Sequence, residues 1–134
     1  MNVKDLMQSA EENTTPFYYY DMELLENTLN KLKYAADKYK YNVHYALKAN
    51  TNGRVLDLIS SYGFGADCVS GNEIGKAVAH GFCPDQIAFA GVGKTDREIE
   101  VGLGNDIFCF NCESIQEIEV INEIATREKK IANI

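Results

Sequence analysis

The sequence has few positively charged residues, no long apolar run and no apolar segment at its start. Of its 134 residues, 13 are Lys or Arg and 20 are Asp or Glu, which gives a net charge of −7. Binding to nucleic acid or to an anionic membrane usually needs a surplus of basic residues, so this composition argues against both partners. No run approaches the roughly 20 apolar residues of a membrane span. Residues 1–15 are polar and acidic and lack the apolar core of a signal peptide. With 46% hydrophobic residues, the chain is expected to be a folded, cytoplasmic, single domain.

Patterns typical of metal sites and disulfide frameworks are also scarce. The four cysteines are Cys68, Cys83, Cys109 and Cys112. Without a secretory signal we expect reduced thiols. Cys109 and Cys112 form one C-x-x-C pair, but there is no second pair, and His44 and His80 are not spaced as its partners. We therefore predict no metal site, and we interpret Cys109 as a small buried apolar residue.

The chain begins with a short strand-like segment and a long helix. Residues 17–21 are rich in strand-forming side chains. From Asp21, a suitable N-cap, an amphipathic helix is predicted to run to about Lys40. Its apolar stripe steps by three and four residues and consists of Leu25, Leu29, Leu32, Ala36 and Tyr39.

A strand–helix unit then repeats every 20 to 24 residues. Apolar strands are predicted near Tyr45, Ala66, Phe89 and Phe108, and another begins near Ile131. Three segments that follow these strands match the capping box, in which a hydroxyl and a Glu three residues later bond to backbone amides. They are Ser70–Glu73, Thr95–Glu98 and Ser114–Glu117. Asn52 is expected to cap the remaining helix, and Gly63 and Gly81 to end helices.

This repetition predicts an α/β fold with parallel strands. A closed (β/α)8 barrel typically needs about 250 residues, and the observed units supply about half of that. Either the chain is a small open α/β sheet, or it is the first half of a longer barrel. We favour the second interpretation.

The glycine-rich segments do not match nucleotide-binding motifs. Residues 88–95 (AFAGVGKT) resemble a P-loop, but Ala88 stands where the first glycine of that motif is required. Gly63–Gly65 and Gly102–Gly104 begin a dinucleotide-binding pattern without its third glycine. We interpret these segments as turns.

Lys48 is the strongest candidate for chemistry. It follows the strand near Tyr45, at the carboxyl end where α/β folds place their ligand sites. Strand alternation would place it on the same face as His44 and Ala46. An exposed lysine at a strand end would simply reach solvent, whereas a desolvated one would be an amine nucleophile for a carbonyl. Position alone favours the exposed interpretation without excluding the other.

Residues 44–50 (HYALKAN) resemble the cofactor-lysine motif of the fold-type III pyridoxal-phosphate-dependent decarboxylases. Residues 63–73 (GFGADCVSGNE), 89–95 (FAGVGKT) and 110–114 (FNCES) resemble the next three strand–loop segments of that family, in the same order and at similar spacing. The resemblance implies an alanine-racemase-like (β/α)8 barrel, with about the first half present and the carboxy-terminal β-domain missing. It assigns residues 21–134 to the barrel and residues 1–20 to the β-domain.

The resemblance also implies roles for individual residues. Lys48 would bind pyridoxal 5'-phosphate covalently and act catalytically. Asp67 would lie beside the cofactor and the lysine, and Ala46 would line the site beneath the ring. Ser70 and Glu73 belong to the family signature and are expected to contribute to cofactor binding, although their capping pair explains them equally well.

Among the members, the sequence is most similar to those that decarboxylate meso-2,6-diaminopimelate to L-lysine. Ornithine or arginine decarboxylation and a non-catalytic cofactor carrier are the alternatives. Lys94 and Glu113 are expected to support the scaffold. The resemblance further implies a small amino-acid substrate and a homodimer at full length. We expect an isolated chain of this length to bind cofactor poorly and to be inactive.

Overall fold

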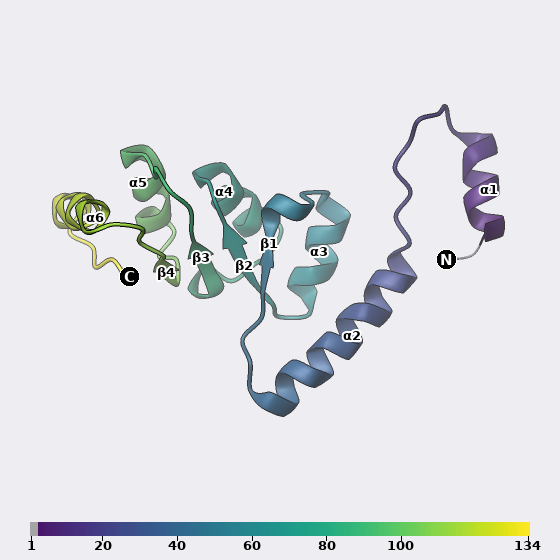
Figure 1. The fold of residues 1–134 in the computed structure, drawn as a ribbon, viewed down its shortest axis with the longest axis horizontal. Coiled ribbons are helices and arrows are strands. Elements are labelled where there is room, and N and C mark those ends of the chain that lie inside the picture. Colours follow the sequence, from purple (N-terminus) through teal and green to yellow (C-terminus); the bar gives the residue numbers. More distant parts are fainter. Residues whose placement is uncertain (1–2) are drawn as a thin grey trace.

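The computed structural model describes residues 3–134 as a parallel four-stranded sheet with a helix after each strand (Figure 1). The elements are α1 (Val3–Glu12), α2 (Met22–Tyr39), β1 (His44–Ala46), the 3-10 turn η1 (Leu47–Ala49), α3 (Gly53–Ser61), β2 (Gly65–Cys68), α4 (Gly71–Ala79), the 3-10 turn η2 (Pro84–Gln86), β3 (Ile87–Phe89), α5 (Asp96–Gly104), β4 (Cys109–Phe110) and α6 (Ile115–Glu128). The strands lie in the order β1-β2-β3-β4, and all neighbours are parallel. The predicted α/β class is therefore confirmed.

At the β4 edge of the sheet, a single backbone hydrogen bond joins β4 to the last residues of the chain. The Phe110 N–H donates to the carbonyl of Asn133 at 2.8 Å. That bond is of the kind a fifth parallel strand would make. Residues 131–134 nevertheless form no regular strand, because one bond does not make a ladder, and the strand predicted near Ile131 is absent here.

The capping residues position the helices largely as predicted. Asp21 accepts from the Leu24 N–H at 2.9 Å, and Asn52 accepts from the Arg54 N–H at 3.1 Å. The helices after β1 and β2 stop before Gly63 and Gly81, which have φ values of +71° and +81°. These left-handed conformations suit glycine at a helix end.

Only one of the three predicted capping boxes is complete. Thr95 and Glu98 bond reciprocally to backbone amides. Ser70 and Ser114 cap α4 and α6, but the glutamate of each pair reaches one residue further back. Glu73 accepts from the Val69 N–H, and Glu117 accepts from the Glu113 N–H, both at 2.7 Å. These bonds tie the helix starts to the strand ends that precede them.

The apolar core lies between the sheet and the helices after the strands. The largest fully buried side chains include Leu47, Leu56, Ile74, Phe89, Ile99, Phe110 and Ile121. The apolar stripe of α2 is only half used, since Leu29 and Ala36 are buried while Leu32 and Tyr39 are 41% and 61% exposed. Helix α2 lies at the β1 side of the sheet and slants away from it (Figure 1), and it packs mainly on α3. Part of its predicted apolar stripe therefore contacts no other element of the described chain.

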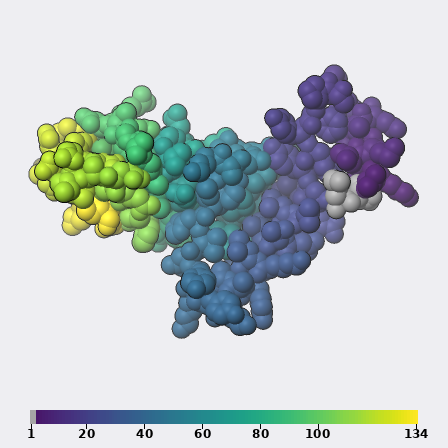
Figure 2. All heavy atoms as spheres, in the orientation of Figure 1, coloured from purple at the N-terminus to yellow at the C-terminus, as the bar shows by residue number. Residues whose placement is uncertain are grey.

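The N-terminal segment differs most from expectation. Residues 3–12 form helix α1, none of whose residues is buried, and it lies at one end of the molecule away from the sheet (Figures 1 and 2). Residues 17–21 form no strand, because the described part of the chain offers them no strand to pair with. The first two residues of the predicted segment 1–20 lie outside the described residues. None of the described helices is long and apolar enough to cross a membrane.

Candidate functional site

Lys48 lies just beyond the carboxyl end of β1, in the 3-10 turn Leu47–Ala49. The strand itself ends at Ala46, so the alternation predicted to run through Lys48 stops two residues early. Leu47 is completely buried in the core, whereas Lys48 is exposed. The turn therefore anchors the backbone through Leu47 and leaves the lysine amine accessible at the edge of the sheet.

Ala46, Asp67 and Ala88 form a row across three neighbouring strands. Ala46 pairs in register with Asp67, and Asp67 pairs with Ala88. Ala66 and Cys68, on either side of Asp67, are fully buried against the helices, so the Asp67 side chain faces the opposite side of the sheet. This face carries two small side chains and one carboxylate, close to the turn that holds the lysine.

Ser70 and Glu73 lie directly after β2, at the same end of the sheet. The Ser70 hydroxyl accepts from the Glu73 N–H at 3.2 Å, and the Glu73 carboxylate accepts from the Val69 N–H. The structure thus gives both residues a capping role. Their contribution to cofactor binding stays a prediction.

The Glu98 carboxylate accepts hydrogen bonds from backbone amides at the starts of two helices, α4 and α5. Its Oε2 accepts from the Thr95 N–H at 3.1 Å, and its Oε1 accepts from the Gly71 N–H at 3.0 Å. These backbone bonds, that from Thr95 foremost, lower the pKa of Glu98, so the carboxylate stays charged at neutral pH. The first turn of α4 is therefore bonded to a side chain from α5.

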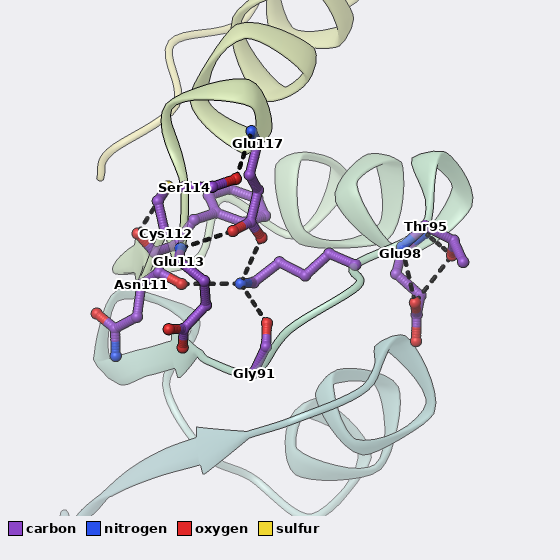
Figure 3. Close-up of polar contacts among 10 residues, drawn as sticks. Gly91, Thr95, Glu98, Asn111, Cys112, Glu113, Ser114 and Glu117 are labelled. Carbon is purple, nitrogen blue, oxygen red and sulfur yellow. Dashed lines mark hydrogen bonds and ion pairs between the residues drawn. The ribbon is translucent and has the colours of Figure 1, made fainter.

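Lys94 is a buried connector and not a phosphate ligand. Its Nζ donates to the carbonyls of Gly91 and Asn111, both at 2.8 Å, and to Oε1 of Glu117 at 2.7 Å. Figure 3 shows these three acceptors converging from the loops after β3 and β4 and from α6. The Lys94 side chain is 1% exposed. With every donor engaged, it has no capacity for a nucleotide, which agrees with our rejection of a P-loop and with the scaffold role predicted for Lys94.

The cysteines form no reactive centre. Cys68 is fully buried, and burial, with smaller contributions from nearby carboxylates, raises the pKa of its thiol to about 12. Cys109 is partly exposed, on the same side of the sheet as Asp67, and not buried as predicted. Among residues 3–134 there is no group of His, Cys, Asp and Glu side chains that could hold a metal ion.

Sequence reasoning did not single out three polar residues near the site. Glu98 and Glu117 were expected only as members of capping boxes, and the pattern could not show that each would bond to a second element. Asn50, in the loop after Lys48, enters the sequence analysis only as the last residue of the motif at residues 44–50. A signal was present in each case, because each residue stands at a strand end or a helix start.

Comparison with known proteins identifies the domain. Residues 23–134 match the family model described as the pyridoxal binding domain of pyridoxal-dependent decarboxylases. The chain belongs to this decarboxylase family. It is 57% identical over 121 residues to diaminopimelate decarboxylase of Bacteroides thetaiotaomicron, and 41% identical over 124 residues to that of Helicobacter pylori. These matches cover 90% and 92% of the chain but 31% and 30% of the relatives.

Solved structures give the same picture. Diaminopimelate decarboxylase from M. jannaschii superposes with a TM-score of 0.89 at 34% identity, over 93% of this chain and 30% of its own. The Helicobacter pylori enzyme complexed with L-lysine gives a TM-score of 0.80 at 37% identity, over 98% of this chain and 32% of its own. The chain thus spans about a third of the length of these relatives.

Proposed function

We propose that the protein carrying this chain decarboxylates meso-2,6-diaminopimelate to L-lysine and CO2, with pyridoxal 5'-phosphate bound at Lys48. The single observation that carries this proposal is the position of Lys48 beyond the end of β1, beside the row formed by Ala46 and Asp67. Family membership supplies the chemical class. Because the chain spans a third of its relatives, the activity, the substrate and the partners of the whole protein are part of the proposal.

The residues present fit the cofactor. A covalent partner for an aldehyde must be an accessible amine, and Lys48 is exposed at the edge of the sheet. A flat ring needs a shallow surface, which the small side chains of Ala46 and Ala88 leave on either side of Asp67. When bound, pyridoxal phosphate supplies a carbonyl that condenses with amines and a ring that accepts the electron pair left by departing CO2.

In this proposal the residues of the chain divide the work. The Lys48 amine would hold the cofactor at the carboxyl end of β1, and the cofactor would supply a carbonyl that either this amine or the substrate amine can occupy. The carboxylate of Asp67 stabilises and orients the positively charged groups beside it. In the net reaction the bond to the carboxylate carbon breaks and a proton replaces it, so CO2 and L-lysine balance the substrate and that proton.

Diaminopimelate is favoured over other basic amino acids by sequence similarity. The relatives at 57% and 41% identity are both diaminopimelate decarboxylases. An arginine decarboxylase of a Chlorella virus is 22% identical with a TM-score of 0.79, and this likeness shows the fold alone. Turnover assays of the full-length protein with diaminopimelate, ornithine and arginine test the choice, and activity confined to either of the others would overturn it.

Borohydride trapping of the full-length protein tests the cofactor site directly. Reduction in the presence of pyridoxal phosphate is expected to leave the cofactor mass on Lys48, as read by peptide mass spectrometry. Lys48→Ala should lose this label and keep its fold, because the side chain is exposed. Labelling elsewhere, or no labelling, would refute the proposal. Labelling without turnover would favour a non-catalytic carrier.

Four further properties of the whole protein stay predictions. They are the closed eight-stranded barrel, the homodimer, the place of residues 1–20 in a β-domain and the cytoplasmic location.

A further inference from the structure

Asn50, two residues after Lys48, is held by three hydrogen bonds. The Tyr45 hydroxyl donates to the backbone carbonyl of Asn50 at 3.1 Å. The Asn52 N–H donates to Oδ1 of Asn50 at 2.9 Å. The Asn50 amide Nδ2 donates to the hydroxyl of Tyr20 at 3.2 Å. Both ends of the side-chain amide and the backbone carbonyl are therefore engaged.

These bonds enclose the turn that carries the lysine. Tyr45 lies in β1, before the turn, and Asn52 is the N-cap of α3, after it. Leu47 fixes the start of the turn by its complete burial, and Asn50 fixes its end. Lys48 lies between these two anchors. A lysine side chain has a long flexible stem, so the direction in which its amine leaves the sheet depends on how firmly the backbone is held.

The third bond brings in a distant part of the chain. Tyr20 belongs to residues 17–21, which precede α2 without regular secondary structure, and it is 40% exposed. Its bond to Asn50 joins positions 30 residues apart. Within β1, burial is the main cause of a raised pKa at Tyr45, so that phenol stays protonated and remains a donor at neutral pH.

We propose that Asn50 is a positioning residue for Lys48, which couples residues 17–21 to the turn Leu47–Ala49 and sets the direction from which the lysine amine meets its carbonyl partner. This inference rests on the proposed function, since it needs pyridoxal phosphate to react at Lys48. Asn50 itself does no chemistry in this proposal. It acts by removing freedom from the backbone on which the amine is carried.

The test measures how fast pyridoxal phosphate becomes attached to Lys48 in the full-length protein freed of cofactor. Samples are quenched with borohydride at successive times, and the label on Lys48 is quantified by mass spectrometry. Asn50→Ala removes two of the three bonds and is expected to slow attachment on the order of tenfold. Tyr20→Phe removes one hydroxyl and should slow it by roughly threefold. Asn50→Asp keeps the acceptor for the Asn52 N–H and offers a second carboxylate oxygen to which the Tyr20 hydroxyl can donate in place of accepting, so it should restore most of the rate.

Asn52→Ala is the matched control. It removes the side-chain cap of α3, which should lower the thermal midpoint by a few degrees, yet it keeps the backbone N–H that bonds to Asn50. The rate at which pyridoxal phosphate attaches to Lys48 should stay within about twofold of the parent, because all three hydrogen bonds of Asn50 are intact. The contrast separates loss of positioning from loss of stability.

The rates of these variants decide between positioning of Lys48 and general loss of stability. A slowed Asn50→Ala variant, rescued by Asn50→Asp, supports the inference. Unchanged rates in Asn50→Ala overturn it, as does slowing matched by Asn52→Ala at equal loss of thermal midpoint. Should Asn50→Ala not fold, Tyr20→Phe decides, because its ring is half-exposed and an unchanged rate there overturns the coupling. Absence of any label on Lys48 in the parent defeats the proposed function, a result distinct from the others.

Discussion

The Nζ atom of Lys94 lies 2.7 Å from Oε1 of Glu117, in an ion pair with side chains 1% and 11% exposed. The same ammonium group lies 5.3 Å from the centre of the Phe89 ring. It thereby joins β3, the loop after β4 and the start of α6 at the edge of the sheet where the site is formed. Geometry of this quality is what a buried ion pair needs to offset the cost of removing two charges from water.

Lys94→Met is expected to destabilise the protein strongly. Removing one partner of a buried pair leaves the other charge without compensation, which costs about 3–5 kcal/mol in the free energy of unfolding. The matched control is Lys33→Met, whose partner Asp37 lies at 2.8 Å in a pair that is 43% and 61% exposed. That change should cost less than about 1 kcal/mol. Urea unfolding measures both, and equal losses would contradict the assignment of Lys94 as a buried connector.

Stability is also expected to fall in acid because two carboxylates bind protons weakly in the folded state. Backbone hydrogen bonds lower the pKa of Glu98 below its ordinary value of 4.5. Burial raises the pKa of Glu117, but bonds from Glu113 and Lys94 outweigh it, so the net shift is downward from 4.5. A lowered folded pKa stabilises the protein above the unfolded value, and this contribution is lost as pH falls through the folded pKa.

Unfolding free energies measured from about pH 6 to about pH 3 should therefore decrease most steeply below the ordinary carboxyl value. Glu98→Gln should flatten this decrease, since the titrating group is gone. Glu100→Gln, on the same helix but in an exposed pair with Arg127, is the matched control for the loss of a negative charge. If the parent and Glu98→Gln lose stability with the same slope, the two backbone hydrogen bonds of Glu98 do not persist in solution.

Ser70→Ala and Ser114→Ala form a comparison that separates capping from cofactor binding. Both hydroxyls cap a helix in the same way, accepting at 3.2 and 3.1 Å from the residue three positions on. Each loss should cost about 1 kcal/mol in the free energy of unfolding. If Ser70 serves only as a cap, the full-length variants will bind pyridoxal phosphate equally well. A weaker affinity confined to Ser70→Ala would show that it also contacts the cofactor, as the resemblance implies.

The sequence predicted the repeating part of the fold well and its irregular parts poorly. Strand, cap, helix and glycine recur with a fixed spacing, and each cap is a local interaction, so Asn52, Ser70, Thr95 and Ser114 could be read without tertiary information. The exposed half of the α2 stripe could not, because periodicity reports which residues share a face and not whether a partner covers it. Helix α1 has no buried residue and left no comparable signal.

At the candidate site, the sequence predicts residues but not their surroundings. Motif resemblance predicts Lys48, Asp67 and Ala46 as site residues, and the register pairs Asp67 with Ala46 on the neighbouring strand. The turn that ends β1 before Lys48 was missed, since a strand of three residues is too short for alternation to define its end. Contacts such as Glu98 to Gly71 join residues 27 positions apart, and only folding brings them together.

Residues 1–134 alone are expected to hold pyridoxal phosphate weakly, because the helix starts at the carboxyl end of the sheet are bonded to the chain's own side chains. Asn52 caps α3, Ser70 and Glu98 bond to α4, Thr95 caps α5 and Ser114 caps α6. A phosphate group bound at a helix start must displace such partners.

We therefore expect the 134-residue polypeptide to react with pyridoxal and with pyridoxal phosphate at similar rates, as read by the label on Lys48 after borohydride. The full-length protein should prefer the phosphate form by at least about tenfold, through donors supplied outside these residues. Equal occupancy of the short and full-length proteins at the same phosphate-cofactor concentration would show instead that this part of the chain contains the phosphate site.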